Sequence, residues 1–336
     1  MSDILLDVQN LRTCFPGKKK VIHAVNGVSF TVGYGEILGL VGESGSGKSA
    51  TCRSIIQLLP FGGRIIEGKI IYKGDDIVKK SERGMRTIRG REIGMIFQEP
   101  MNTLNPVTTI GEQIQETLRN KGTSREQRKK RAIELLRLVN IPSPDKRIYE
   151  YPHQFSGGMR QRAMIAIALA SEPKLLIADE PTTALDVTIQ QQIMKLLLDI
   201  RNHFHMGIIM ITHNLGVASQ ICDTIAVMYA GRIVEKAPAS ELFLNPQHPY
   251  THGLMQSIPS ADKKGSKLVP IAGHPPDLSV ELQGCPFAER CPYCMDKCIS
   301  EMPVPSYITE KHSCCCHLVG KLDFLNTNVG RSKEVG

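Results

Sequence analysis

The sequence predicts an α/β fold built on a mostly parallel sheet, and short apolar segments are the main reason. Several runs are nearly continuous in apolar residues, with helical patterns between them. Such a run is typical of a strand buried on both faces. Strands that alternate with helices indicate a parallel sheet covered by helices. The predicted strands are Glu36 to Val41, Lys174 to Ala178, Gly207 to Thr212 and Thr224 to Tyr229.

Two other regions depart from this alternation. From Leu5 to Phe30 apolar and polar residues alternate with turn residues between them, which predicts an antiparallel start to a sheet. After Pro106 the chain becomes polar, charged and helical, so we expect a helical subdomain at about 101–160. Its basic face is interpreted as solvated.

The length of 336 residues suggests one large domain and a smaller one, since a domain takes roughly 100 to 200 residues. A proline-rich stretch follows Ser260, so we place the boundary there, between 1–260 and 261–336. No apolar run approaches the roughly 20 residues that span a bilayer. Met1 to Val8 does not read as a secretory signal, and we expect a cytoplasmic protein. The net charge of +8 does not choose between nucleotide, nucleic acid and lipid partners.

A phosphate-binding loop follows the first predicted parallel strand. The segment GESGSGKS matches the pattern GxxxxGK[ST] in the required position. Its glycines let backbone amides turn toward phosphates, Lys48 supplies positive charge, and Ser49 offers a hydroxyl to magnesium. The sequence therefore predicts an ATP and Mg²⁺ site. Its candidate binding residues in this loop are Gly42, Ser44, Gly45, Ser46, Gly47, Lys48, Ser49 and Ala50.

An acidic pair, Asp179 and Glu180, ends another predicted strand. A magnesium nucleotide site needs an acidic residue at such a strand end. Asp179 would help to hold magnesium through water, and Glu180 would act as a general base or orient water at the γ-phosphate. Alone, such a pair is more often a turn or a helix cap. The phosphate loop upstream favours the nucleotide interpretation.

The segment FSGGM, Phe155 to Met159, resembles the signature motif of ABC ATPases. The resemblance implies that Ser156, Gly157 and Gly158 contact the ATP held by the opposite subunit. A serine followed by two glycines at a helix start suits this role, because exposed amides and the helix dipole stabilise a phosphate.

Other segments resemble further motifs of that family. Gln98 resembles the glutamine of the Q-loop, which touches magnesium, and His213 resembles the switch histidine that senses the γ-phosphate. The segment 184–186 resembles the D-loop. Phe15 resembles the aromatic residue that stacks on adenine, although it could equally be a core phenylalanine.

Three positions depart from the family pattern. Phe155 and Met159 stand where Leu and Gln are usual in the signature, and both are familiar in the peptide-transport branch. Asn214 replaces an Asp after the switch histidine, which removes a charge and puts the positioning of that histidine in question.

Four segments resemble the oligopeptide and dipeptide import ATPases: 98–106, 151–162, 178–190 and 242–254. The resemblance implies a RecA-like core, an antiparallel β subdomain, a helical subdomain and a small Cys-rich C-terminal extension. It also implies a second ATPase subunit, identical or paralogous, two transmembrane permease subunits and, indirectly, an extracytoplasmic peptide-binding protein. The site of action would be the cytoplasmic face of the cell membrane.

Other cargoes and another class of protein remain to be weighed. Related importers carry nickel, glutathione or other small solutes with the same ATPase. A soluble ABC protein acting on nucleic acid is disfavoured, because such proteins usually carry two fused cassettes or a long coiled coil, and this chain has neither. We therefore expect no nucleic acid partner.

Seven of the ten cysteines lie between Cys285 and Cys316, whereas Cys14, Cys52 and Cys222 stand alone as small buried hydrophobes. The family resemblance implies that a 4Fe-4S cluster, in a structural role, is held by Cys285, Cys291, Cys298 and Cys316. Zinc is an alternative, because spacing alone does not distinguish the two, and disulfides are a further one. The additional cysteines Cys294, Cys314 and Cys315 leave the fourth ligand open.

Overall fold

The computed structural model of the chain describes residues 3–17, 20–60, 62–99, 103–119, 122–182, 185–257, 270–280 and 282–322. In this part of the chain the central sheet has the strand order β11-β12-β10-β9-β3-β8-β7-β6. The strands from β9 to β6 are parallel, as predicted, and β10 and β12 extend the sheet in the antiparallel sense. The strands are β3 (Ile37–Val41), β6 (Ile93–Ile96), β7 (Leu175–Asp179), β8 (Gly207–Thr212), β9 (Thr224–Tyr229), β10 (Arg232–Pro238), β11 (Ser306–Tyr307) and β12 (Ser313–Cys314).

The central parallel strands are apolar on both sides because both faces of the sheet are covered. Every residue of β3, β7 and β8 is buried. In β8, Ile208 and Met210 belong to one core cluster, and Ile209 and Ile211 belong to the other. Burial of each such side chain contributes about 1.5–3 kcal/mol. The continuous apolar runs in the sequence are therefore explained by two cores, one on each face.

A second, antiparallel sheet covers one face of the central sheet, as the alternating N-terminal pattern predicts. Its order is β2-β1-β4-β5, and the long strands β1 and β2 pair along most of their length. Helix α1 (Lys48–Ile55) lies between the two sheets. The strands are β1 (Ile4–Pro16), β2 (Val21–Gly33), β4 (Arg64–Tyr72) and β5 (Asp75–Asp76), followed by η1 (Ile77–Lys79) and α2 (Glu82–Ile88).

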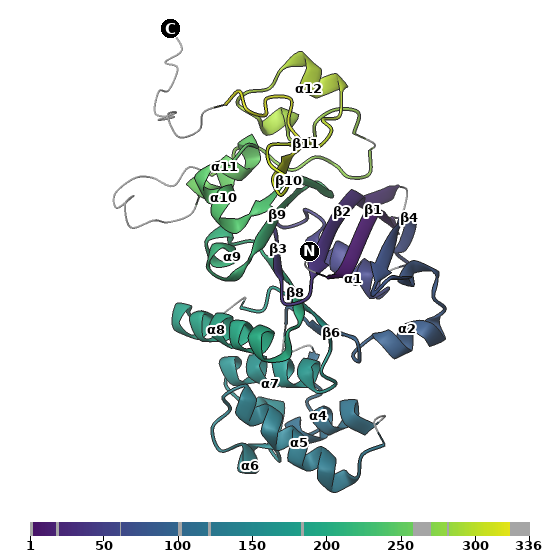
Figure 1. Ribbon diagram of the computed structural model, residues 1–336, viewed down its shortest axis with the longest axis vertical. Coiled ribbons are helices and arrows are strands. Elements are labelled where there is room, and N and C mark those ends of the chain that lie inside the picture. Colours follow the sequence, from purple (N-terminus) through teal and green to yellow (C-terminus); the bar gives the residue numbers. More distant parts are fainter. Residues whose placement is uncertain are drawn as a thin grey trace.

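A helical region forms the lower end of the molecule in Figure 1. Local signals define its helices: Thr109 and Glu112 form a capping box at the start of α4, and Ser124 and Gln127 form another at the start of α5. Helix α7 runs from this region back to the central sheet, where α8 and α9 cover the same face. The elements are α4 (Ile110–Leu118), α5 (Arg125–Leu138), α6 (Pro144–Arg147), η3 (Pro152–Gln154), α7 (Gly157–Leu169), α8 (Val187–Phe204) and α9 (Leu215–Ile221).

The cysteine-rich C-terminal segment adds strands to the central sheet. Glu235 of β10 pairs with Cys314 of β12, and β12 pairs in turn with β11. The boundary proposed near Ser260 lies outside the described residues. The remaining elements are α10 (Ala239–Leu244), α11 (Pro249–Gln256), η5 (Ala288–Arg290) and α12 (Asp296–Ser300). In the described part of the chain, no helix combines the length and apolar character needed to cross a membrane.

Candidate active site

The phosphate loop connects β3 to α1, and two of its glycines are required by close packing. A Cβ atom at Gly42 would lie 2.1 Å from the carbonyl oxygen of Met228, and one at Gly47 would lie 2.4 Å from that of Ala24. Gly47 also has φ 100°, a left-handed conformation that favours glycine. Ser44 and Gly45 are exposed, whereas Ser46 is buried and Ala50 is partly buried in the first turn of α1. The loop therefore leaves its tip open to a ligand.

Lys48 points into the phosphate loop. Its Nζ donates to the carbonyl oxygens of Gly42 and Glu43, both at 2.7 Å, and to Ser46 Oγ at 3.2 Å. Burial lowers the pKa of Lys48, and the negative charges of Glu180, Asp179 and Glu43 oppose that shift. All three of these acceptors are oxygen atoms, and phosphate oxygens can take their place.

Ser49 and Asp179 form the candidate magnesium site. Ser49 Oγ donates a hydrogen bond of 2.9 Å to Asp179 Oδ1, at the end of β7. Asp179 is 1% exposed, and burial raises its pKa, while the hydrogen bond from Ser49 acts in the opposite direction. Hydroxyl and carboxylate oxygens are the ligand types that Mg²⁺ accepts. The donor set therefore fits the predicted metal.

Glu180 joins Gln98 and His213 at the same edge of the sheet. Gln98 Nε2 donates to Glu180 Oε2 at 3.0 Å, and His213 Nδ1 lies 3.4 Å from Glu180 Oε1. Gln98 follows β6, Glu180 follows β7 and His213 follows β8, which are adjacent parallel strands. The carboxyl ends of parallel strands meet at one edge, where ligands bind. Glu180 also has φ 46°, a strained conformation for a residue other than glycine.

The signature segment begins helix α7. Ser156 is the N-cap residue, and its Oγ accepts a hydrogen bond of 3.3 Å from the amide of Met159. Ser156 and Gly157 are exposed, and a Cβ atom at Gly158 would lie 3.0 Å from Ile189 Cγ2. In Figure 1, α7 lies well apart from α1, which follows the phosphate loop. The start of α7 is therefore exposed in this chain.

The remaining predicted positions have defined local roles. Phe15 is partly buried in β1, and its ring occupies the space above Gly63, where a Cβ atom would lie 2.4 Å from Phe15 Cε1. Asn214 Oδ1 accepts from the amide of Val217, so this residue is the N-cap of α9. Asp186 is the N-cap of α8, and Ala184 lies outside the described residues. The amide side chain of Asn214 thus retains a capping function without a charge.

Family comparisons agree with this geometry. A family model described as ABC transporter matches residues 25–183, and one described as oligopeptide/dipeptide transporter, C-terminal region, matches residues 234–298. The chain is 50% identical over 318 residues to the probable peptide ABC transporter ATP-binding protein y4tR of Sinorhizobium fredii, covering 94% of this chain and 95% of that protein. It is 48% identical over 316 residues to the dipeptide transport ATP-binding protein DppD of Bacillus subtilis, covering 94% of each chain. The chain belongs to the peptide ABC transporter ATP-binding family.

As a member of this family, the ABC ATPase hydrolyses ATP and couples the hydrolysis to transport. Solved structures share its fold. The dimeric post-hydrolysis state of the ATP-binding cassette MJ0796 bound to ADP and Pi matches with a TM-score of 0.63 and 28% identity, covering 70% of this chain and 98% of that chain. The cbiO1 protein of Clostridium perfringens, part of the cbiONQ transporter complex, matches with the same TM-score and identity over 72% of this chain and 92% of that one.

In the C-terminal region of this ABC ATPase, all four predicted cluster cysteines line one small pocket. Cys285, Cys291, Cys298 and Cys316 surround it together with His248 and His317. The amide of Cys285 donates to the carbonyl oxygen of Cys298 at 2.7 Å, which joins two of the cysteine-bearing segments. Within the described ranges, no three His, Cys, Asp or Glu side chains converge closely enough to hold one metal ion.

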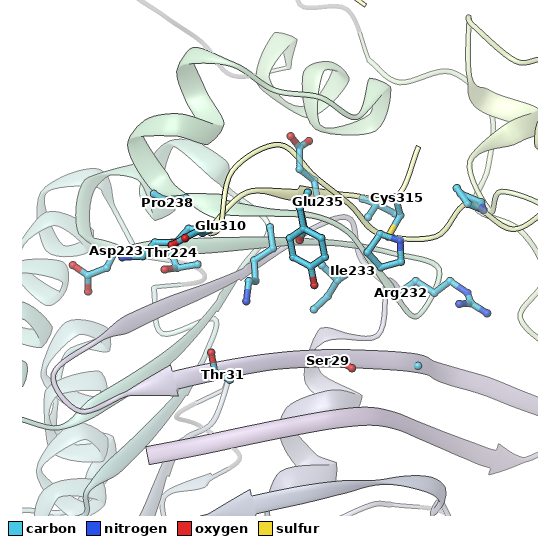
Figure 2. Close-up of a pocket in the computed structure, with 18 of the residues that line it drawn as sticks. Ser29, Thr31, Asp223, Thr224, Arg232, Ile233, Glu235, Pro238, Glu310 and Cys315 are labelled. Atoms are coloured by element: carbon cyan, nitrogen blue, oxygen red, sulfur yellow. The ribbon is translucent and has the colours of Figure 1, made fainter. Parts of the chain in front are cut away.

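The structure separates the three consecutive cysteines. Cys314 is fully buried in β12, and Cys315 lines a different pocket beside Arg232 and Ile233, as Figure 2 shows. Cys316 lines the cysteine pocket. Cys294 is exposed. Within the described residues, Cys316 is therefore the member of the triple cysteine that lines the cysteine pocket.

One contact of the phosphate loop is not expected from the sequence. Arg290, which immediately precedes Cys291, forms an ion pair with Glu43 of the loop. No local signal indicates this contact, because the two residues are 247 positions apart and Glu43 occupies a variable position of the motif.

Proposed function

We propose that this ABC ATPase powers uptake of dipeptides or oligopeptides as a peripheral subunit of a bacterial importer, at the cytoplasmic face of the cell membrane. The observation that carries its ATPase part is the meeting of Gln98, Glu180 and His213 beside Lys48 and Ser49. The cargo is supported by relatives whose names specify peptide or dipeptide transport. Nickel, glutathione or another small solute is the alternative cargo.

In the proposed reaction, Lys48 exchanges its carbonyl partners for phosphate oxygens of ATP. Ser49 and Gln98 would hold Mg²⁺, with Asp179 acting through water, and the bound ion would supply positive charge beside the phosphates. The glycines and amides of 42–50 hold the phosphates in place.

Glu180 accepts a proton from water as the water oxygen forms a bond to the γ-phosphorus. The bond from that phosphorus to the bridging oxygen breaks, and ADP and phosphate are the products. His213 orients Glu180 and the γ-phosphate. The close approach of Gln98 and His213 to the Glu180 carboxylate supports this division of roles.

The complete site is proposed to form between two ATPase subunits, identical or paralogous. Ser156, Gly157 and Gly158 would contact the ATP held by the partner, and Phe15 would stack on adenine. The exposed start of α7 and the separation of α7 from α1 in Figure 1 support this arrangement. Two transmembrane permease subunits and an extracytoplasmic peptide-binding protein would complete the importer.

The cysteine pocket is proposed to hold a 4Fe-4S cluster that stabilises the C-terminal segment, with Cys285, Cys291, Cys298 and Cys316 as its ligands. Four thiols from separate segments line one pocket, which fits the usual ligand set of such a cluster. A single zinc ion needs sulfur atoms at about 2.3 Å from one point. Zinc held by the same thiols is the alternative occupant, and metal analysis of the purified protein distinguishes the two.

The substitution Glu180→Gln tests the proposed function. It keeps the hydrogen-bonding shape but cannot accept the proton, so we expect kcat for ATP hydrolysis to fall about a hundredfold or more while MgATP still binds. In cells that depend on this subunit, uptake of a labelled dipeptide should be lost and uptake of labelled nickel should be unchanged.

The matched control is Glu126→Gln, at an exposed position in the first turn of α5, which should alter neither measurement. Undiminished hydrolysis in the Glu180 variant would remove this residue from the role of catalytic carboxylate. Loss of nickel uptake with intact dipeptide uptake would contradict the peptide cargo.

A further inference from the structure

Arg290, in the cysteine-rich segment, forms an ion pair with Glu43 of the phosphate loop. Its Nη1 lies 2.7 Å from Glu43 Oε2, and its Nη2 lies 3.0 Å from Glu43 Oε1. This bidentate geometry is the strongest form of an arginine–carboxylate contact. The Arg290 side chain is only 5% exposed, and that of Glu43 is 29% exposed, so water screens the pair weakly.

The guanidinium group of Arg290 is fixed by its surroundings. Nε donates to the carbonyl oxygen of Ala272 at 2.8 Å, and Nη2 donates to that of Ile271 at 3.2 Å. Nη1 also contacts the hydroxyl of Tyr229, and the guanidinium lies over the rings of Tyr229 and Phe287, 5.6 and 5.9 Å from their centroids. A side chain held at so many points loses little further freedom when it orients a partner.

Three groups of Glu43, its amide, its carbonyl oxygen and its carboxylate, each contact a different residue. Its amide donates to the Tyr250 hydroxyl at 2.9 Å, its carbonyl oxygen accepts from Lys48, and its carboxylate meets Arg290. The amide of Glu43 is therefore occupied by the Tyr250 hydroxyl. The rings of Tyr229, Tyr250 and Phe287 pack together, with centroids 4.7 to 5.4 Å apart, and support this side of the loop.

A carboxylate in a phosphate loop opposes the binding of a polyanion, because like charges repel strongly where water is partly excluded. Arg290 supplies the compensating charge from the other side of the loop. We propose that Arg290 is a positioning residue for the phosphate loop, a role that rests on the ATP binding proposed above. It neutralises Glu43 and fixes the loop for ATP, so that nucleotide affinity depends on the folded cysteine-rich segment.

The test is the affinity of the full chain for a fluorescent probe, N-methylanthraniloyl-ATP with Mg²⁺, and for unlabelled ATP as its competitor. For Arg290→Met we expect Kd to rise about tenfold, because the Glu43 charge is left uncompensated. Adding Glu43→Gln to Arg290→Met should recover most of the lost affinity. Arg290→Lys keeps the positive charge but loses the bidentate hydrogen bonding of the guanidinium group, so its Kd should lie between those of the wild type and Arg290→Met.

Ionic strength separates this role from a merely structural one. The defect of Arg290→Met should shrink at about 1 M salt, where the Debye length falls to about 3 Å. A folding defect would not respond in this way. Thermal unfolding and circular dichroism measured on the same samples report any loss of structure.

Two controls complete the design. Arg137→Met removes an exposed arginine whose closest approach to Asp145 is 3.6 Å, and it should leave Kd unchanged. Lys48→Ala should abolish binding; if it does not, the assigned ATP site fails rather than the role of Arg290. An Arg290→Met Kd within about twofold of wild type, or a double variant as weak as Arg290→Met, would overturn the proposal.

Discussion

The nucleotide site and the cysteine pocket both gather side chains from distant parts of the chain, but different structures position them. Gln98, Glu180 and His213 each follow a parallel strand, and the register of β6, β7 and β8 brings them to one edge. The cysteines lie on short irregular segments around η5, α12 and β12. Regular strands position the first site, whereas individual side-chain contacts position the second.

This difference has an energetic consequence. The scaffold of the nucleotide site is a large apolar core, so the loss of one polar contact removes a small part of its stability. The cysteine-rich segment is attached to β10 through a few buried polar contacts, including that between His312 and Glu235. Substitutions in the two regions should therefore differ in their effect on folding.

The largest expected effect is at His312, which joins the C-terminal segment to two elements of the ATPase. Its Nε2 lies 2.9 Å from Glu235 Oε1 of β10, and its Nδ1 lies 2.9 Å from Glu241 Oε1 of α10. Because it would leave Glu235 buried without this partner, His312→Gln should lower the free energy of unfolding by about 3 kcal/mol near neutral pH.

The pH dependence of this effect has a defined sign. Burial lowers the pKa of His312, but the hydrogen bonds with Glu235 and Glu241 outweigh burial, and the net shift is upward. The stabilisation is therefore complete below the unfolded pKa of about 6.5 and is lost as pH rises through the higher folded value. Thermal unfolding between about pH 6 and 9 measures this. A wild-type advantage that grows with pH, or an equal loss in the exposed control His274→Gln, would contradict the assignment.

A smaller effect is expected from Cys316→Ser, for which Cys315→Ser is the matched control. Only Cys316 lines the cysteine pocket with the other three thiols. Protein purified without oxygen should contain roughly four irons and four labile sulfides per chain. Cys316→Ser should lose most of them and about 2 kcal/mol of stability, because a bound ligand stabilises the folded state. Cys315→Ser should retain both.

One zinc and no iron in the wild-type protein would refute the cluster. Iron retained in Cys316→Ser but lost in Cys315→Ser would show that the neighbouring thiol is the ligand.

The smallest effect is expected in the helical region, where helix starts are defined locally. Thr109→Ala removes the N-cap of α4 and one half of its capping box. It should cost about 1 kcal/mol, measured by urea unfolding, with no change in iron content or MgATP affinity. Thr87→Ala serves as the control, because the exposed Thr87 hydroxyl donates to the carbonyl oxygen of Gly84 within α2, and it should change stability by no more than about 0.5 kcal/mol. A cost near that at His312 would remove the contrast between the two regions.

Part of the nucleotide site was predictable from the sequence, because Lys48, Asp179 and His213 each come after a recognisable apolar strand. The residue spacing of the phosphate-loop motif and the apolar runs before Asp179 and His213 predict the parallel strands. They also predict the edge of the sheet at which these side chains meet. The glycines at 42 and 47 are explained by contacts with Met228 and Ala24, which the sequence does not reveal.

The contacts of the C-terminal segment were not predictable, because they join residues far apart without a periodic signal. The pairing of β12 with β10 depends on a strand of two residues, too short for any alternation to be recognised. The ion pair between Arg290 and Glu43 spans 247 positions. In the triple cysteine, only the path of the chain beyond β12 separates Cys316 from its neighbours.

Strand β10 has a consequence for any shortened form of this protein. Its backbone pairs with β9 on one side and with β12 on the other. A chain that ended before the cysteine-rich segment would present β10 as an open sheet edge, with Glu235 deprived of His312. Unpaired edges recruit strands from other molecules. The C-terminal segment therefore also protects the ATPase from edge-to-edge aggregation.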